Sequence, residues 1–201
     1  DGTDIHTATA AQVFGMPIDM VTPVMRSRAK AVNFGIVYGI GAFSLSKDIG
    51  VTRKEADSYI KSYLASYPQV ASYMENTINE AKLNGYVTTL FGRRRYLPEL
   101  ASSNGMLRAF GERVARNAPI QGTAADIIKL AMVKVFDKLA EVVPSAKLIL
   151  QVHDELIVEC DENDAKTVCN ILKTEMENAV KLNVDLIADG NYGKNWLESK
   201  G

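Results

Sequence analysis

The sequence predicts an α+β fold. A mostly helical first part, residues 1–100, is followed by a second part, residues 101–201, in which a small antiparallel sheet packs on helices. Three observations support this prediction. Capped segments with apolar residues at helical spacing fill most of the first part, the period changes on either side of Gly92, and two apolar runs flank the charged residues 153–155.

The composition is that of a globular protein. The chain has 201 residues, 47% hydrophobic and 23% charged, which is enough to bury a core. No apolar run approaches the roughly 18 uncharged residues of a membrane span, and no signal segment opens the sequence, so we expect a soluble cytoplasmic protein with no membrane partner. Cys160 and Cys169 lack metal-site or CxxC spacing, so we expect two ordinary thiols.

Charge is distributed unevenly along the chain. The overall net charge is −1, but residues 1–25 carry −3, residues 26–134 carry +8 and residues 135–201 carry −6. The middle segment is therefore a candidate surface for a polyanion, and the acidic end either repels nucleic acid or holds metal ions.

The first two predicted helices have clear boundary signals. Residues 4–14 form a short helix that ends near Gly15. Thr22 is an N-cap with Pro23 at the first helical position, and the helix they open runs to about Tyr38, before a pair of glycines.

Two more helices follow, separated by Pro68. The first begins with Thr52 three residues before Glu55, which is capping-box spacing, and the second ends at Gly85.

A hairpin and a long helical region come next. β-Branched and aromatic residues on both sides of Gly92 predict the small hairpin. The helical region runs from about Asn104 to Leu139, with an expected interruption near Pro119 and Gly122, because proline removes a backbone donor.

The clearest strand signal lies at residues 147–159. Apolar runs on both sides of a His-Asp-Glu turn predict a hairpin there. A helix from Glu162 to Leu182 and a last short strand near Asp185–Ala188 complete the predicted fold.

A stripe of cations and aromatic rings runs along the predicted helix 22–39. Arg26, Lys30, Phe34 and Tyr38 are spaced by four residues, so they form one slowly winding row about 18 Å long. This length suits a nucleoside triphosphate, with its phosphates at the cations and its base against the rings. The alternative is an amphipathic helix with solvated cations and both rings in the core, and on spacing alone it is the commoner arrangement.

Adjacent carboxylates lie at the turn of the second hairpin. Asp154 and Glu155 offer oxygen ligands that suit Mg²⁺, which takes one or two protein carboxylates beside substrate phosphates. A polar turn that only joins two strands is an equally good interpretation of this segment.

Polar donors follow one face of the long helical region. Arg113, Asn117 and Gln121 are spaced by four residues and could donate to minor-groove acceptors shared by all base pairs. Arg94, in the first hairpin, could contact phosphates. Surface amides and a solvated turn are the alternatives.

Together these segments resemble the family A DNA polymerases of the bacterial DNA polymerase I type. "RSRAKAVNFGIVYG" is similar to their motif B, the fingers helix that binds the incoming nucleotide, and "QVHDE" is similar to their motif C in the palm. "DIHTATAAQVFG", "GYVTTLFGRRRYLP" and "NAPIQGTAADIIK" also resemble family stretches, in the family's order. The resemblance covers nearly the whole chain.

The resemblance implies a function and a domain organisation. Residues 1–100 correspond to the fingers, with the nucleotide-binding helix at 22–39, and residues 101–201 to the later palm. The implied function is template-directed DNA synthesis in replication and repair, with dNTPs and primer-template DNA as partners and two Mg²⁺ ions as cofactors. Motif A, the thumb and the exonuclease regions are not matched, so we expect little activity without the remainder of the polypeptide.

The resemblance also implies roles for the stripe. Arg26 and Lys30 would bind the triphosphate, and Lys30 is a candidate proton donor to pyrophosphate. Phe34 would pack by the sugar and base, Tyr38 would guard the templating position, and His6 would lie near the phosphates.

Motif C carries the remaining catalytic roles. Asp154 would be a metal ligand, Glu155 a weaker or outer ligand, and His153 a contact to the primer terminus. The minor-groove contacts implied by the resemblance are Arg113, Asn117 and Gln121.

The sequence leaves two alternative functions for the chain. One is a non-catalytic fragment that binds nucleotide or duplex DNA. The other is a single-subunit RNA polymerase, which Phe34 and the Asp154-Glu155 pair disfavour.

Overall fold

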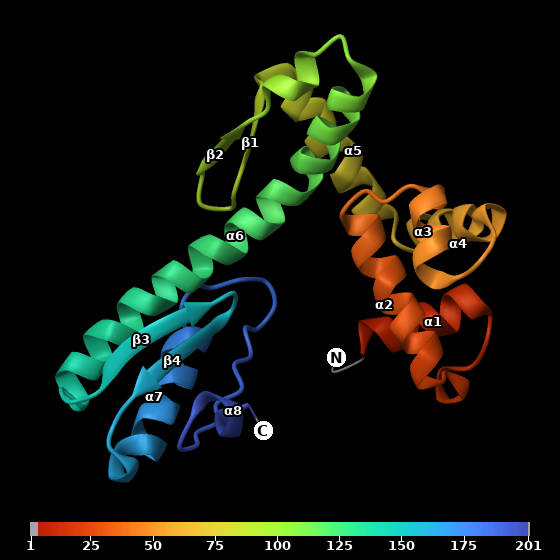
Figure 1. The fold of residues 1–201 in the computed structure, drawn as a ribbon. Coiled ribbons are helices and arrows are strands. Elements are labelled where there is room, and N and C mark those ends of the chain that lie inside the picture. Colours follow the sequence, from red (N-terminus) through yellow and green to blue (C-terminus); the bar gives the residue numbers. More distant parts are fainter. Residues whose placement is uncertain (1–3, 201) are drawn as a thin grey trace. The chain divides into compact units, whose positions relative to one another are not determined.

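The computed structural model describes residues 4–200, which fold into two compact units. The first unit ends at Ile120 and the second begins at Gln121. Two small antiparallel sheets lie among predominantly helical elements (Figure 1), so the predicted α+β class is confirmed. In chain order the elements are α1 (Ile5–Phe14), η1 (Ile18–Met20), α2 (Pro23–Val37), α3 (Ala42–Ile49), α4 (Arg53–Ser66), α5 (Pro68–Asn84), β1 (Tyr86–Thr88), β2 (Arg94–Tyr96), η2 (Pro98–Ala101), α6 (Gly105–Val142), β3 (Lys147–Val152), β4 (Glu155–Glu159), η3 (Glu162–Asp164), α7 (Ala165–Glu177) and α8 (Trp196–Ser199).

Side-chain caps fix the helix starts in the first unit. Asp4 caps α1 by accepting a hydrogen bond from the His6 backbone N–H. Thr22 caps α2 in the same way, with Pro23 as its first residue. At α4, Thr52 forms the predicted capping box with its partner three residues on. These local signals therefore place the helices as the sequence predicted.

The end of α2 is a Schellman motif. Gly39 has a left-handed φ of 75°, its N–H donates to the Ile36 carbonyl, and the Ile40 N–H donates to the Gly35 carbonyl. A Cβ on Gly35 would lie 2.7 Å from the Ile40 side chain. Glycine is therefore needed at position 35 because Ile40, five residues later, folds back onto the helix.

Replacing Gly39 with alanine should destabilise the first unit by about 1–2 kcal/mol, because an L side chain is strained at this φ. A Cβ there would also lie 2.6 Å from Nη1 of Arg116. Gly50→Ala is the matched control, since Gly50 has a φ of 67° and no neighbouring atom within 4 Å of the added carbon. Urea denaturation of both variants measures the difference. A loss for Gly50→Ala as large as that for Gly39→Ala would show that the Arg116 contact adds nothing.

Two clusters of buried side chains hold the first unit together. The larger one joins α2, α3 and α4, and the second joins α5, the β1–β2 hairpin, η2 and α6. Helix α3, which the sequence patterns did not predict, contributes Leu45 and Ile49 to the larger cluster. The buried members of the larger cluster are Val32, Ile36, Leu45, Ile49, Ala56 and Tyr63.

The predicted hairpin around Gly92 is confirmed. Strands β1 and β2 pair antiparallel, with Tyr86 opposite Tyr96 and Thr88 opposite Arg94. Gly92 has a φ of 81°, which suits a tight connection between the strands.

Helix α6 continues through the position where an interruption was predicted. Pro119 lies inside the helix, so the expected break near Pro119 and Gly122 is wrong. Proline costs about 3 kcal/mol inside a helix, but α6 packs into a core on both sides of it, through Ala115 before and Val135 after. This packing outweighs the local cost.

In the second unit, α6 and α7 pack with the β3–β4 hairpin (Figure 1). Val152 pairs with Glu155, so His153 and Asp154 form a two-residue turn. His153 has a φ of 53°, and positive φ at the first turn residue is typical of hairpins of this length. The buried members of this core are Ala131, Val135, Leu139, Val143, Leu156, Val168, Ile171 and Ala179.

Two predictions for the end of the chain are wrong. The last long helix ends at Glu177 rather than Leu182, where Asn178 turns its amide back onto the Thr174 carbonyl. Residues 185–188 do not form a strand in the structure. The only sheet of the second unit, within residues 121–200, is the β3–β4 pair, and a lone extended segment without a paired neighbour has no ladder to join.

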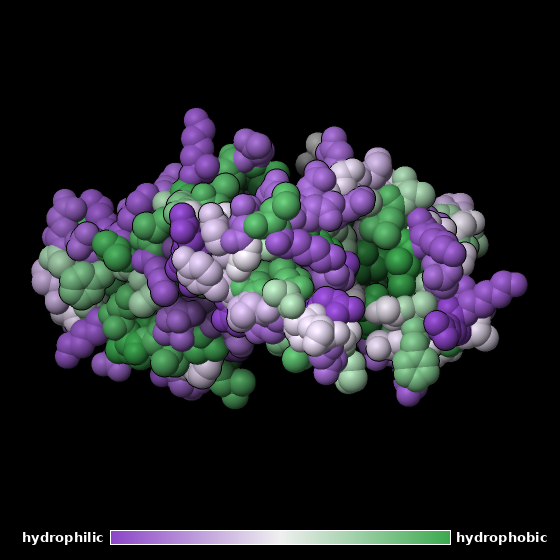
Figure 2. Space-filling view, turned by 90° about the horizontal axis from the view of Figure 1, so that it is seen from above, coloured by the Kyte–Doolittle hydropathy of each residue, from purple (hydrophilic) through white to green (hydrophobic). Residues whose placement is uncertain are grey.

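Among residues 4–200, no helix combines the length and apolar character needed to cross a membrane. Cys160 and Cys169 are free thiols, as expected. Hydrophobic side chains also reach the surface, where Figure 2 shows them as green patches among hydrophilic groups.

Candidate nucleotide and metal sites

The cationic and aromatic stripe lies on the exposed side of α2. Phe34 is 45% exposed and Tyr38 is 41% exposed, and their ring centroids lie 6.0 Å apart in a stacked arrangement. The Lys30 ammonium lies 5.9 Å from the Phe34 ring centroid. The alternative that places both rings in the core is therefore wrong. The buried side of α2 consists of Ala29, Val32, Asn33 and Ile36.

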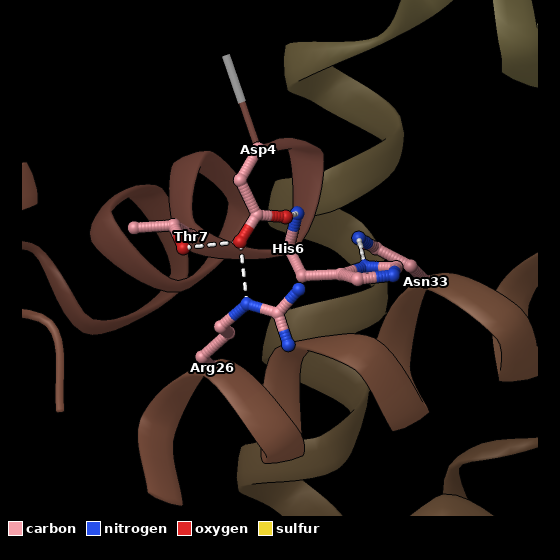
Figure 3. Close-up of polar contacts among 5 residues, drawn as sticks. All are labelled: Asp4, His6, Thr7, Arg26 and Asn33. Carbon is pink, nitrogen blue, oxygen red and sulfur yellow. Dashed lines mark hydrogen bonds and ion pairs between the residues drawn. The ribbon is translucent and has the colours of Figure 1, made fainter. Parts of the chain in front are cut away.

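His6 joins this stripe from the first turn of α1. Its ring centroid lies 5.7 Å from that of Phe34. Its Nδ1 lies 3.0 Å from Nδ2 of Asn33, which is buried on α2 (Figure 3). This contact turns the other ring nitrogen, Nε2, away from Asn33. The structure therefore brings together His6 and the stripe, which are far apart in the sequence.

Arg26 is held by the carboxylate of Asp4. Oδ2 of Asp4 accepts hydrogen bonds from Nε of Arg26 and from the Thr7 hydroxyl, and Oδ1 accepts one from the His6 backbone (Figure 3). The Arg26 hydrogen bond, followed by that of Thr7, holds the pKa of Asp4 well below its usual range. The carboxylate is therefore charged at neutral pH.

The arrangement can hold an anion beside a stacking surface. Arg26 is paired through one edge only, and Lys30 forms no ion pair with an acid among residues 4–200. The two cations therefore begin the stripe, two exposed aromatic rings continue it, and the His6 imidazole lies against the first ring. Guanidinium and ammonium groups bind phosphate oxygens, and aromatic faces accept a base.

Sequence reasoning missed two residues of this cluster. Asp4 carries an N-cap signal, but its partner Arg26 is 22 residues away in the sequence. No local spacing pattern predicts a contact over that separation. Asn33 lies beside Phe34 at a buried helical position, where a polar side chain needs a partner. A polar residue on the apolar face of α2 was the available signal.

The two carboxylates at the β3–β4 turn differ in their hydrogen-bond and ion-pair partners. Asp154 is exposed, and its side chain makes no hydrogen bond or ion pair with any residue that the structure describes. Glu155 accepts a hydrogen bond from Trp196 Nε1 at 3.3 Å and lies 3.4 Å from the Lys200 ammonium. The C-terminal segment therefore engages Glu155 and leaves Asp154 available.

This turn fits one side of a magnesium site. A rigid hairpin presents Asp154 to solvent, and Mg²⁺ takes oxygen ligands from one or two carboxylates together with water and phosphate. Within residues 4–200, no group of three or more His, Cys, Asp or Glu side chains forms a metal cage. The turn suits an ion whose other ligands include substrate phosphates.

Four of the five predicted DNA-contacting side chains lie on α6 and on the first hairpin, and the fifth, His153, lies in the β3–β4 turn. Arg113 and Gln121 are exposed, and Asn117 is half-buried with its Oδ1 atom unpartnered among the described residues. The Arg113 guanidinium lies 5.9 Å from the Phe110 ring. Arg94 lies 4.6 Å from the Tyr86 ring, and a hydrogen bond with Tyr96 raises the pKa of this arginine.

These groups are divided between the two units. The stripe, His6 and Arg94 belong to the first unit, and the His153-Asp154-Glu155 turn belongs to the second. The unit boundary after Ile120 falls between Asn117 and Gln121 on α6.

Solved and sequenced proteins resemble the chain over its full length. It is 52% identical over 200 residues to DNA polymerase I of Caldicellulosiruptor bescii, covering 100% of this chain and 24% of the relative. It is 51% identical to DNA polymerase I of Bacillus subtilis over 98% of this chain and 22% of that protein. The chain therefore spans about a quarter of the length of these relatives.

A solved structure has the same fold. It is the polymerase domain of Pol1 from M. smegmatis in complex with DNA primer-template and dNTP. It matches 100% of this chain and 35% of its own, with a TM-score of 0.94 and 39% identity. The model of DNA polymerase family A matches residues 1–198. The chain belongs to DNA polymerase family A.

Proposed function

We propose that this chain is the nucleotide-binding and metal-binding portion of a DNA-directed DNA polymerase. The observation that carries the proposal is the exposed stripe on α2, with its paired arginine, unpaired lysine and stacked rings. Membership of family A supports it, since the similar structure from M. smegmatis was solved with primer-template and dNTP.

Nucleotide binding is assigned to the first unit. Arg26 and Lys30 bind the triphosphate, with His6 beside the phosphates. Phe34 packs against the sugar and base, and Tyr38, at the end of the helix, lies at the templating position. The cations precede the rings along α2, so the dNTP lies with its phosphates toward the start of the helix.

The reaction transfers a nucleotidyl group to a primer. The primer 3′ oxygen forms a bond to the α-phosphorus as its hydroxyl releases a proton to solvent, and the bond between that phosphorus and the oxygen bridging to the β-phosphate breaks. Lys30 donates a proton to the departing pyrophosphate. Asp154 and Glu155 would hold Mg²⁺, and two such ions, when bound, stabilise the entering and leaving oxygens.

Binding of DNA is assigned to side chains of both units. Arg113, Asn117 and Gln121 donate to acceptors in the minor groove. His153, at the hairpin tip, contacts the primer terminus. Arg94 contacts phosphate.

A binding role without catalysis is the second candidate for the chain in isolation. The hairpin supplies two carboxylates, and no larger group of metal ligands lies within residues 4–200. We therefore expect the purified 201-residue chain to bind dNTP with an affinity that falls as salt increases, without extending a primer. Fluorescence titration with a labelled dNTP and a primer-extension assay measure the two properties. Magnesium-dependent extension by the chain alone would contradict this expectation.

The proposed function itself is tested in the complete polymerase that contains this chain. It should extend a primer on a DNA template with dNTPs and Mg²⁺, and should prefer dNTPs to ribonucleotides. Failure to extend any primer, or preference for ribonucleotides, would reject the assignment.

A further inference from the structure

We propose that Asp4 is a positioning residue for nucleotide binding: its carboxylate holds Arg26 through Nε, so that both Nη groups are presented to the triphosphate. This inference rests on the proposed function of the stripe. It adds a carboxylate to a site that otherwise consists of cations and aromatic rings.

The carboxylate of Asp4 is anchored in three directions. Its Oδ1 atom accepts the His6 backbone N–H at 3.1 Å, and its Oδ2 atom accepts the Thr7 hydroxyl at 2.7 Å. Both bonds come from the first turn of α1, where Asp4 is the N-cap. The third bond, from Nε of Arg26, therefore attaches α2 to the start of α1 (Figure 3).

Asp4 occupies one edge of the guanidinium and leaves the other open. Arginine carries five N–H donors in a rigid planar fork. The dashed line from Asp4 in Figure 3 ends on Nε, and neither Nη atom bonds to a residue within 4–200. A phosphate can therefore bind the Nη pair without displacing Asp4, and it meets a guanidinium whose orientation is already set.

The same carboxylate also fixes the position of His6. By capping α1, Asp4 sets the first turn of the helix that carries the imidazole, and the His6 ring lies against Phe34 and Asn33 of α2. One acidic side chain thus helps to position both groups that are proposed to face the phosphates, the Arg26 guanidinium and the His6 imidazole. Its own negative charge is offset by Arg26, so it need not repel an incoming anion.

The test is Asp4→Asn in the complete polymerase, with single-nucleotide incorporation measured against dNTP concentration. Asparagine keeps an oxygen for the helix cap but loses the charged partner of Arg26. We expect KM for dNTP to rise about tenfold, with kcat changed much less, since a charge-assisted hydrogen bond is lost. Asp4→Ser, which also retains a capping oxygen, should likewise raise KM while changing kcat much less. Asp19→Asn is the matched control, because it removes an exposed acid of η1 and should leave KM unchanged.

A double-mutant cycle separates positioning from a structural role. If Asp4 acts through Arg26, Asp4→Asn should raise KM no further in an Arg26→Ala background. A full additional effect there, with equal melting temperatures, would mean that Asp4 affects nucleotide binding independently of Arg26, and would overturn the inference.

The remaining outcomes are also decisive. A lower KM for Asp4→Asn would show that the carboxylate competes with phosphate for Arg26, which overturns the proposal, as would an unchanged KM. If the wild-type enzyme extends primers, a lower or an unchanged KM for the variant contradicts only this inference and leaves the proposed function standing. A wild-type enzyme without extension would reject the proposed function and this inference with it.

Discussion

Replacing Asp154 with alanine in the complete polymerase should lower the single-turnover rate of primer extension by about a thousandfold or more. The reason is that the proposed ion supplies several kcal/mol of transition-state stabilisation, and each 1.4 kcal/mol is about tenfold in rate. Affinity for primer-template should change little, because Asp154 is an exposed acid that repels rather than attracts phosphate. Rapid-quench extension measures the rate, and fluorescence anisotropy measures DNA binding.

The variant should keep the hairpin intact, which makes the result interpretable. The positive φ of the turn falls on His153, so alanine at position 154 introduces no strain of that kind. Asp161→Ala is the matched control, since Asp161 is an exposed acid shortly after β4 and precedes η3 without a side-chain cap. Near-normal extension by Asp154→Ala, or an equal loss in the control, would be evidence against the metal role.

The structure explains why the two neighbouring acids should differ. Glu155 is engaged by Trp196 and Lys200 of the C-terminal segment, whereas Asp154 has no partner within residues 4–200. An ion that binds Glu155 must compete with an ammonium group, while Asp154 is available without rearrangement. This asymmetry agrees with the proposal that Asp154 is the principal ligand and Glu155 the weaker one.

Local chemistry made much of the fold predictable. Helix starts at Thr22 and Thr52 follow from hydroxyl caps, and the end of α2 follows from the glycine after Tyr38, because each signal acts within one turn of the chain. The strands around residues 153–154 follow from apolar runs that need no distant partner to be recognised.

The errors fall where distant packing decides the structure. Whether Pro119 ends α6 depends on cores that form with residues far along the chain, and no local signal reports them. The segment 185–188 has strand-like composition but no paired neighbour within the described residues. At the candidate site, spacing predicted the stripe correctly, while the pairing of Asp4 with Arg26 and of Asn33 with His6 depended on the packing of α1 against α2.

Replacing Lys30 with alanine is expected to lower kcat/KM for dNTP by about a hundredfold to a thousandfold. The variant loses a charged contact to the triphosphate and a proton donor to pyrophosphate, and general acid catalysis alone contributes about 10²–10⁴-fold. Unlike Arg26, Lys30 has no acidic partner within residues 4–200, so its charge is available to the ligand. Pre-steady-state incorporation over a range of dNTP concentrations separates the loss of affinity from the loss of rate.

Two further variants distinguish a specific role of Lys30 from a general loss of positive charge. Lys30→Arg keeps a positive charge with a much weaker acid, so it should restore much of the affinity but little of the rate if Lys30 donates a proton. Lys61→Ala removes an exposed lysine of α4 that is paired with Asp57, and should leave both constants unchanged. If Lys30→Ala lost no more than the Lys61 control, the stripe would be a solvated helix face. The orientation of the nucleotide along α2 would then have no support, because Lys30 is the cation that lies next to the first ring.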